Sequence, residues 1–212
     1  KNLLIMKIRG NNMYRRYNLG FIEVITGCMF AGKTEELIKR IRVLEYAKQK
    51  IVVFKPSIDN RYSENEIVSH AGSHCYSQII SNDLEPIKKI INDKSVDVVV
   101  IEEVQFFPEE IVEVCEQLAD NKKRVIVAGL DLDFRGEPFP VMAQLMAKAE
   151  FVTKLSAVCC KCKAPATRTQ RLINGQPAKY DDPIILVGAS ECYEARCRNC
   201  HEVIRVKENK IK

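Results

Sequence analysis

One eight-residue segment restricts the fold of this chain more than any other feature. Residues 27–34 satisfy the pattern G-x-x-x-x-G-K-[S/T]. They follow an apolar, β-branched run at 21–25 and precede a run at 35–48 whose apolar residues recur at helical spacing. In the order strand, loop, helix, such a segment surrounds phosphate groups with backbone N–H groups. The predicted phosphate-binding residues are Gly27, Cys28, Met29, Phe30, Ala31, Gly32, Lys33 and Thr34.

The rest of the first 158 residues alternates strand and helix patterns. Predicted strands cover 50–54, 96–101, 124–130 and 151–158, and predicted helices cover 35–48, 109–119 and 140–149. Near-continuous apolar strands that alternate with helices indicate a parallel sheet covered by helices. The polar run 59–73 is expected to be an active-site or interface loop. The predicted fold class is α/β, with a P-loop parallel sheet.

The composition changes after residue 158 to cysteines, basic residues, glycine and proline, without a helical period. We therefore expect a small C-terminal domain, similar to a zinc ribbon. The predicted divisions are a tail at 1–20, the ATP-binding domain at 21–158, the zinc-binding domain at 159–206 and a basic tail at 207–212.

Nine cysteines are an odd number, and four of them form two C-x-x-C pairs. The pairs Cys159/Cys162 and Cys197/Cys200 supply the ligand set of a structural zinc site, although the segment between them exceeds the usual ribbon spacing. Cys160 lies one residue out of this spacing. The alternatives are reduced cysteines without metal, or an iron site. Metal-binding pairs suit a reducing compartment, so we expect a cytoplasmic protein.

Two glutamates follow the apolar run that ends at residue 101. Ligands bind at the carboxyl ends of parallel strands, where these carboxylates would lie. Strand alternation would direct them to opposite sides, so that one faces Mg²⁺ together with Thr34 and the other faces a substrate hydroxyl. We predict Glu102 as the magnesium ligand and Glu103 as the general base, with Lys33 as the second catalytic residue. The alternative is an exposed acidic strand end without chemistry.

The charge balance and the apolar stretches bear on the class of partner. The chain has 33 basic and 28 acidic residues, a formal charge of +5 that four zinc-bound thiolates would reduce. Such a weak surplus does not indicate nucleic-acid binding. The longest apolar stretches are far shorter than the roughly 20 residues of a membrane helix. We therefore expect neither a nucleic-acid nor a membrane partner.

Several segments together resemble the type II thymidine kinases, the zinc-containing cytosolic family. Residues 102–106, Glu-Glu-Val-Gln-Phe, are similar to the D-E-A-Q-F segment of that family. Met29 and Phe30 within the phosphate loop also match, as does Tyr193 four residues before Cys197. The remaining matches are Asp59, Arg61, Tyr62, Ala128, Gly129, Leu130, Asp131, Phe134, Pro138 and Phe139. The resemblance runs in order from 21 to 201.

The resemblance implies transfer of the ATP γ-phosphoryl group to the 5′-hydroxyl of deoxythymidine, with Mg²⁺ and a structural zinc ion. It also implies a homotetramer that is inhibited by dTTP, and a zinc-binding domain at 159–206 that closes over the nucleoside as a lasso. Arg61 and Gln105 would lie near ATP or the substrate. The implied substrate-binding residues are Met29, Phe106, Leu130, Phe134, Thr169, Ile184, Ile185, Leu186, Val187, Gly188 and Tyr193.

The sequence departs from the family pattern at three places. Glu102 stands where the family usually has Asp, Val104 replaces a small residue, and Leu132-Asp133 differs from the Gly-Thr of some members. Two other functions remain open. A nucleic-acid-handling ATPase with a zinc ribbon would use Glu103 to activate water. A zinc-ribbon binding module would carry an inert phosphate loop.

Overall fold

A six-stranded sheet forms the centre of the molecule. The computed structural model describes residues 19–57, 66–68, 74–184 and 191–205. The strand order in the sheet is β5-β2-β6-β7-β1-β8, and the pairings are parallel. The strands are β1 (Phe21–Thr26), β2 (Ile51–Pro56), β5 (Gln78–Ile80), β6 (Val98–Ile101), β7 (Arg124–Gly129) and β8 (Phe151–Lys154).

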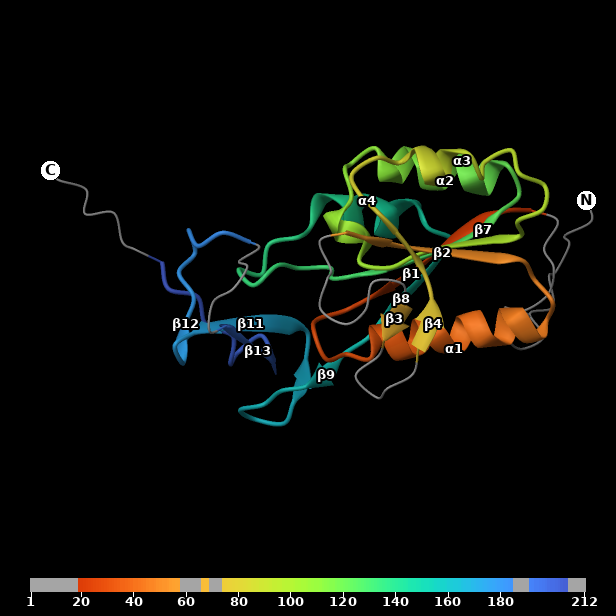
Figure 1. Ribbon diagram of the computed structural model, residues 1–212. Coiled ribbons are helices and arrows are strands. Elements are labelled where there is room, and N and C mark those ends of the chain that lie inside the picture. Colours follow the sequence, from red (N-terminus) through yellow and green to blue (C-terminus); the bar gives the residue numbers. More distant parts are fainter. Residues whose placement is uncertain (1–18, 58–65, 69–73, 185–190, 206–212) are drawn as a thin grey trace, which may run out of the picture.

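Helices cover both faces of this sheet (Figure 1). They are α1 (Lys33–Tyr46), α2 (Glu85–Lys88), α3 (Ile111–Asp120) and α4 (Pro140–Lys148), with a 3-10 turn, η1 (Val104–Phe106). Helix α1 lies on one face, where its predicted apolar residues Leu37, Ile38, Ile41 and Leu44 are buried. Helices α2, α3 and α4 pack on the other face around a second apolar cluster. The predicted α/β class and parallel sheet are confirmed.

The C-terminal part forms smaller antiparallel sheets beside the carboxyl edge of the main sheet (Figure 1). Strand β9 (Ala157–Val158) pairs with β10 (Pro165–Ala166), and β11 (Arg168–Ile173) lies between β12 (Gln176–Pro177) and β13 (Glu191–Arg196). The single strand predicted over 151–158 is therefore wrong. An alternating pattern does not distinguish one long strand from two that belong to different sheets, because both are extended.

The sequence also missed the edge strand β5, which pairs with β2. Its three residues are too few to show a clear alternating pattern. Within the polar run, β3 (Glu66–Val68) pairs with β4 (His74–Tyr76), just beyond it. The central strands β6 and β7 are buried along their whole length, as their apolar runs predict. Among the described helices, none combines the length and apolarity needed to cross a membrane.

Candidate active site

The phosphate loop connects β1 to α1 at the carboxyl edge of the sheet. Gly27 has a φ of 146°, and a Cβ there would lie 2.5 Å from the carbonyl oxygen of Leu155. Gly32 has a φ of 82° in the left-handed region and caps the amino end of α1. Both positions therefore favour glycine. Helix α1 begins directly after this turn, so its first N–H groups and its positive end lie at the loop.

Lys33 and Thr34 begin α1 and reach two different partners. The Lys33 ammonium donates a hydrogen bond to the Cys28 carbonyl oxygen at 3.0 Å, so it lies over the loop. The Thr34 hydroxyl donates to Oε1 of Glu102 at 3.0 Å. Two ligands at neighbouring octahedral positions around Mg²⁺, each at 2.0–2.1 Å, lie roughly 2.9 Å apart. The separation of these two oxygens thus fits a magnesium ion.

Glu103 does not continue strand β6, which ends at Ile101. It has a φ of 49°, in the left-handed region, and precedes η1. The two carboxylates have different partners, because Glu102 accepts from Thr34 and Glu103 accepts from the Gln105 amide. We expected strand alternation to separate the two carboxylates, but this cause is wrong, because Glu103 lies beyond the strand and itself adopts a left-handed conformation.

Gln105 is a buried amide that contacts two strand ends. Its Oε1 accepts a hydrogen bond from the backbone N–H of Leu130 at 3.2 Å. Its Nε2 donates to Oε2 of Glu103. The residue therefore contacts the predicted base directly.

Two aromatic residues predicted near the substrate, Phe106 and Phe134, have different neighbours. The half-buried ring of Phe106 meets that of Phe139 edge to face, with centroids 6.1 Å apart. Phe139 packs against the core. Phe134 is buried, and the Arg171 guanidinium lies 5.0 Å from its ring centroid. Leu130 is half-buried just beyond β7.

The C-terminal strands touch the phosphate loop itself. The Met29 N–H donates to the Thr169 hydroxyl at 3.1 Å, and the Cys28 thiol donates to the Ala166 carbonyl oxygen at 3.3 Å. Burial raises the pKa of the Cys28 thiol, which keeps it protonated as a donor. Cys28 also belongs to the apolar cluster that contains Cys159 and Cys197. The sequence had assigned Cys28 only to the loop.

Only some of the other predicted substrate residues belong to the described part of the chain. Tyr193 is half-buried on β13, opposite Arg171 in the strand register. Ile184 is exposed. Arg61 and the residues Ile185, Leu186, Val187 and Gly188 lie outside the described part of the chain.

Four cysteine sulfurs lie close together just beyond the ends of β9 and β13. The sulfurs of Cys159, Cys162, Cys197 and Cys200 all lie within 4.8 Å of one another. Four sulfurs at 2.3 Å from a tetrahedral zinc ion would lie about 3.8 Å apart. The four-cysteine cluster could therefore hold a zinc ion, and the predicted ligand set is the one that the structure brings together.

Hydrogen bonds within the cluster stabilise the thiolate of Cys159. Burial opposes ionisation of Cys159, but N–H donors outweigh it, including those of Cys162 and Cys197, and lower the pKa of this thiol to about 6. Zinc binds the thiolate form. Cys160 is exposed and lies outside the cluster. His201 is also outside it, because its Nε2 pairs with the Phe134 carbonyl oxygen at 2.8 Å.

Comparison with known proteins decides the family. The family model for thymidine kinase matches residues 20–201, which is most of the chain. This chain belongs to the thymidine kinase family. Membership supports a thymidine kinase function and implies thymidine and ATP as substrates. It also agrees with the resemblance noted in the phosphate loop and at residues 102–106.

One solved structure shows a weaker likeness to this thymidine kinase family member. The flagellar accessory protein FlaH from Methanocaldococcus jannaschii is 11% identical, with a TM-score of 0.43. The match covers 73% of this chain and 80% of that protein. A likeness this distant does not bear on function.

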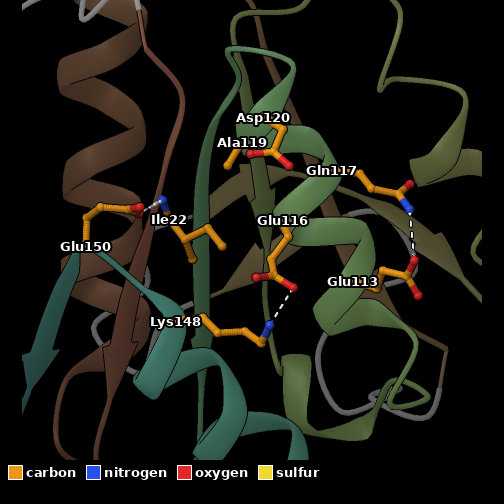
Figure 2. A pocket seen from close by; sticks show the side chains of 8 residues that line it. All are labelled: Ile22, Glu113, Glu116, Gln117, Ala119, Asp120, Lys148 and Glu150. Atoms are coloured by element: carbon orange, nitrogen blue, oxygen red, sulfur yellow. Dashed lines mark hydrogen bonds and ion pairs between the residues drawn. The ribbon is translucent and has the colours of Figure 1, made fainter.

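A separate hollow in this family member lies away from the phosphate loop (Figure 2). Its lining comes from the start of β1, from α3 and from the end of α4, at the amino edge of the sheet. Polar groups there satisfy one another: Lys148 pairs with Glu116 at 2.6 Å, and the Ile22 N–H donates to Glu150 at 2.6 Å. None of the predicted site residues lines it.

Sequence reasoning missed one charged pair at the carboxyl edge. Lys154, the last residue of β8, forms an ion pair with the buried Asp131 at 2.7 Å. Strands β8 and β7 flank β1, so both residues lie near the start of the phosphate loop. No local pattern signals the pair, because its members are 23 positions apart in sequence (154 − 131) and meet only through the sheet order.

Proposed function

We propose that this protein transfers the γ-phosphoryl group of ATP to the 5′-hydroxyl of deoxythymidine. The products are ADP and thymidine monophosphate. The main support is one arrangement at the carboxyl edge of the sheet. The phosphate loop carries Lys33 and Thr34, Thr34 contacts Glu102, and the neighbouring Glu103 keeps a separate partner. Two magnesium ligands beside a carboxylate that has a separate partner suit phosphoryl transfer to a hydroxyl.

In this proposal each residue of the arrangement has one task. The ammonium of Lys33 neutralises charge on the β and γ phosphates. Thr34 and Glu102 would hold Mg²⁺, which supplies further neutralisation of phosphate charge when bound. Glu103 accepts the proton of the 5′-hydroxyl as the new O–P bond forms and the bond from the γ-phosphorus to ADP breaks.

The nucleoside would bind between the phosphate loop and the C-terminal strands. Met29 and Thr169 meet there, and Leu130 and Phe134 follow the neighbouring strand β7. We propose that residues 21–158 bind ATP and that residues 159–206 form a zinc-supported lasso over the nucleoside. The zinc ion would order a segment too small for a core of its own.

Two parts of the proposal rest on the family resemblance alone, the homotetramer and inhibition by dTTP. The proposed cytoplasmic location rests on the two cysteine pairs, because metal-binding cysteines suit a reducing compartment. Size-exclusion chromatography with light scattering tests the first, and kinase assays with added dTTP test the second.

A nucleoside panel tests the reaction. ADP release would be measured with ATP and Mg²⁺, alone and with thymidine, deoxycytidine, deoxyadenosine or single-stranded DNA. We expect ADP release to require thymidine and to match thymidine monophosphate in amount. Release that rises with DNA and ignores nucleosides would instead support a nucleic-acid-handling ATPase.

The variant Glu103→Gln tests the proposed base. It keeps the side-chain shape but does not accept the proton, so kcat should fall by about 10²–10⁴ while ATP and thymidine affinities stay near normal. Glu109→Gln is the control, because Glu109 is an exposed carboxylate a few residues away. If Glu103→Gln kept the wild-type kcat and Glu102→Gln lost it, the two carboxylates would exchange roles.

A further inference from the structure

The side chain of Gln105 connects the ends of two neighbouring strands. Its Oε1 accepts from the Leu130 N–H, one residue beyond β7, and its Nε2 donates to Glu103, two residues beyond β6. Strands β6 and β7 pair directly in the sheet. Gln105 is only 6% exposed, so water does not readily replace either bond. One buried amide thus joins the proposed base to the neighbouring strand.

The chemistry of the two partners determines the orientation of this amide. The Leu130 backbone offers an N–H group, which only donates, so the Gln105 atom facing it must be the oxygen. The NH₂ group then faces Glu103, whose ionised carboxylate only accepts. A flipped amide would lose both bonds. Gln105 therefore presents a donor to Glu103 in a single orientation.

The last residue of β7 makes room for this amide. A Cβ at Gly129 would lie 2.3 Å from Oε1 of Gln105 and 3.0 Å from the sulfur of Met142. The first distance is shorter than any ordinary contact between such atoms. A side chain at position 129 would therefore displace the amide, so this glycine and Gln105 fit each other.

The backbone of Glu103 explains why a separate support is needed. Its φ of 49° is one that residues other than glycine adopt rarely. The turn takes Glu103 off the line of β6, so the strand pattern no longer directs its side chain. Strained backbone that the surroundings hold in place is frequent at functional sites.

We propose that Gln105 is a positioning residue for the Glu103 carboxylate. The inference rests on the proposed function, in which Glu103 accepts the proton of the substrate hydroxyl. The amide holds Oε2 of Glu103 and leaves Oε1 for the substrate. Because a misplacement of about 1 Å can cost about 10²-fold in rate, loss of this donor should lower kcat and leave substrate affinity unchanged.

The variant Gln105→Met tests this role, since methionine has a similar length but donates no hydrogen bond. We expect kcat to fall by roughly 10- to 10²-fold and both KM values to stay within about threefold of wild type. Gln117→Met is the matched control. The Gln117 amide also donates to a glutamate, Glu113, at 3.2 Å, but on the exposed face of α3. A kcat for Gln105→Met within about twofold of that control overturns the proposal.

The same change in a Glu103→Gln background separates positioning from a general structural role. If Gln105 acts through Glu103, adding Gln105→Met should not lower the residual kcat further. An equal loss in both backgrounds overturns the inference. If Glu103→Gln alone kept the wild-type kcat, the proposed base itself would be wrong, and this outcome is distinct from a failure of Gln105.

A second variant keeps the test valid if Gln105→Met does not fold. Gln105→Glu keeps the side-chain shape and the acceptor for the Leu130 N–H, but it places an oxygen against Glu103. The same loss of kcat is expected, with thermal denaturation confirming the fold. Gly129→Ala approaches the same amide from β7 and should show a similar loss. Wild-type kcat in both variants overturns the proposal.

Discussion

Glu23 is a carboxylate buried between two arginines in the middle of β1, and it allows a quantitative test of the fold. Its Oε2 lies 2.8 Å from Nη1 of Arg40, and its Oε1 lies 2.5 Å from Nε of Arg124. The Glu23 side chain is 0% exposed, against 5% and 9% for the arginines. Replacing it by glutamine keeps the volume but leaves two buried cations without their shared counter-charge.

The expected loss follows from the partners that remain. Breaking a buried ion pair by removing one member costs about 3–5 kcal/mol. Arg40 keeps Glu36 at 2.9 Å and the Thr153 hydroxyl at 2.9 Å, and Arg124 keeps the Phe21 ring at 5.4 Å. We therefore expect the lower end, about 3 kcal/mol. For a chain of this size, that loss lowers Tm by roughly 6–12 °C.

Urea denaturation followed by far-UV circular dichroism measures this loss, with an unchanged m-value as the check that the unfolding reaction is the same. Glu116→Gln is the control. It removes an ion pair with Lys148 at 2.6 Å whose side chains are 41% and 40% exposed, and such surface pairs contribute at most about 1 kcal/mol. Equal losses for Glu23→Gln and Glu116→Gln would refute the reasoning.

Three further predictions concern the site and the cysteines. Lys33→Ala should nearly abolish turnover in an ADP-release assay, because the phosphates lose their main cation, and normal kcat would remove the loop from the mechanism. Cys162→Ser should lose bound zinc by metal analysis and weaken thymidine binding most, whereas Cys160→Ser, outside the cluster, should do neither. Thymidine affinity that survives zinc loss would contradict the lasso. Burial raises the pKa of Cys115 to about 12, so iodoacetamide at neutral pH should label the exposed Cys192 and spare Cys115 until the chain unfolds. Labelling of Cys115 in the folded protein would contradict its burial.

Much of the fold was predictable because its signals are local. Apolar runs at β6 and β7 indicated buried parallel strands, and the apolar spacing in α1 indicated its buried face. The short edge strand β5 and the break between β8 and β9 were not predictable, since each depends on which segment happens to lie beside it.

The sequence alone determined the chemistry that depends on spacing along the chain. The glycines of the phosphate loop permit its turns, Lys33 and Thr34 follow from the same motif, and two C-x-x-C pairs supply four thiols for one ion. Each motif consists of residues that are close together in the sequence, so a sequence pattern reveals it. The family resemblance in the sequence is likewise confirmed by the match over residues 20–201.

The tertiary structure alone decided how these pieces act on one another. The contact of Met29 with Thr169 joins residues 140 positions apart, and the bond from Leu130 to Gln105 spans 25 positions. Glu103 adopts a left-handed backbone conformation, which a glutamate in the sequence does not predict. Such contacts form only when strands distant in sequence become neighbours in the sheet, because hydrogen bonds require atoms about 3 Å apart in space and place no condition on their separation along the chain.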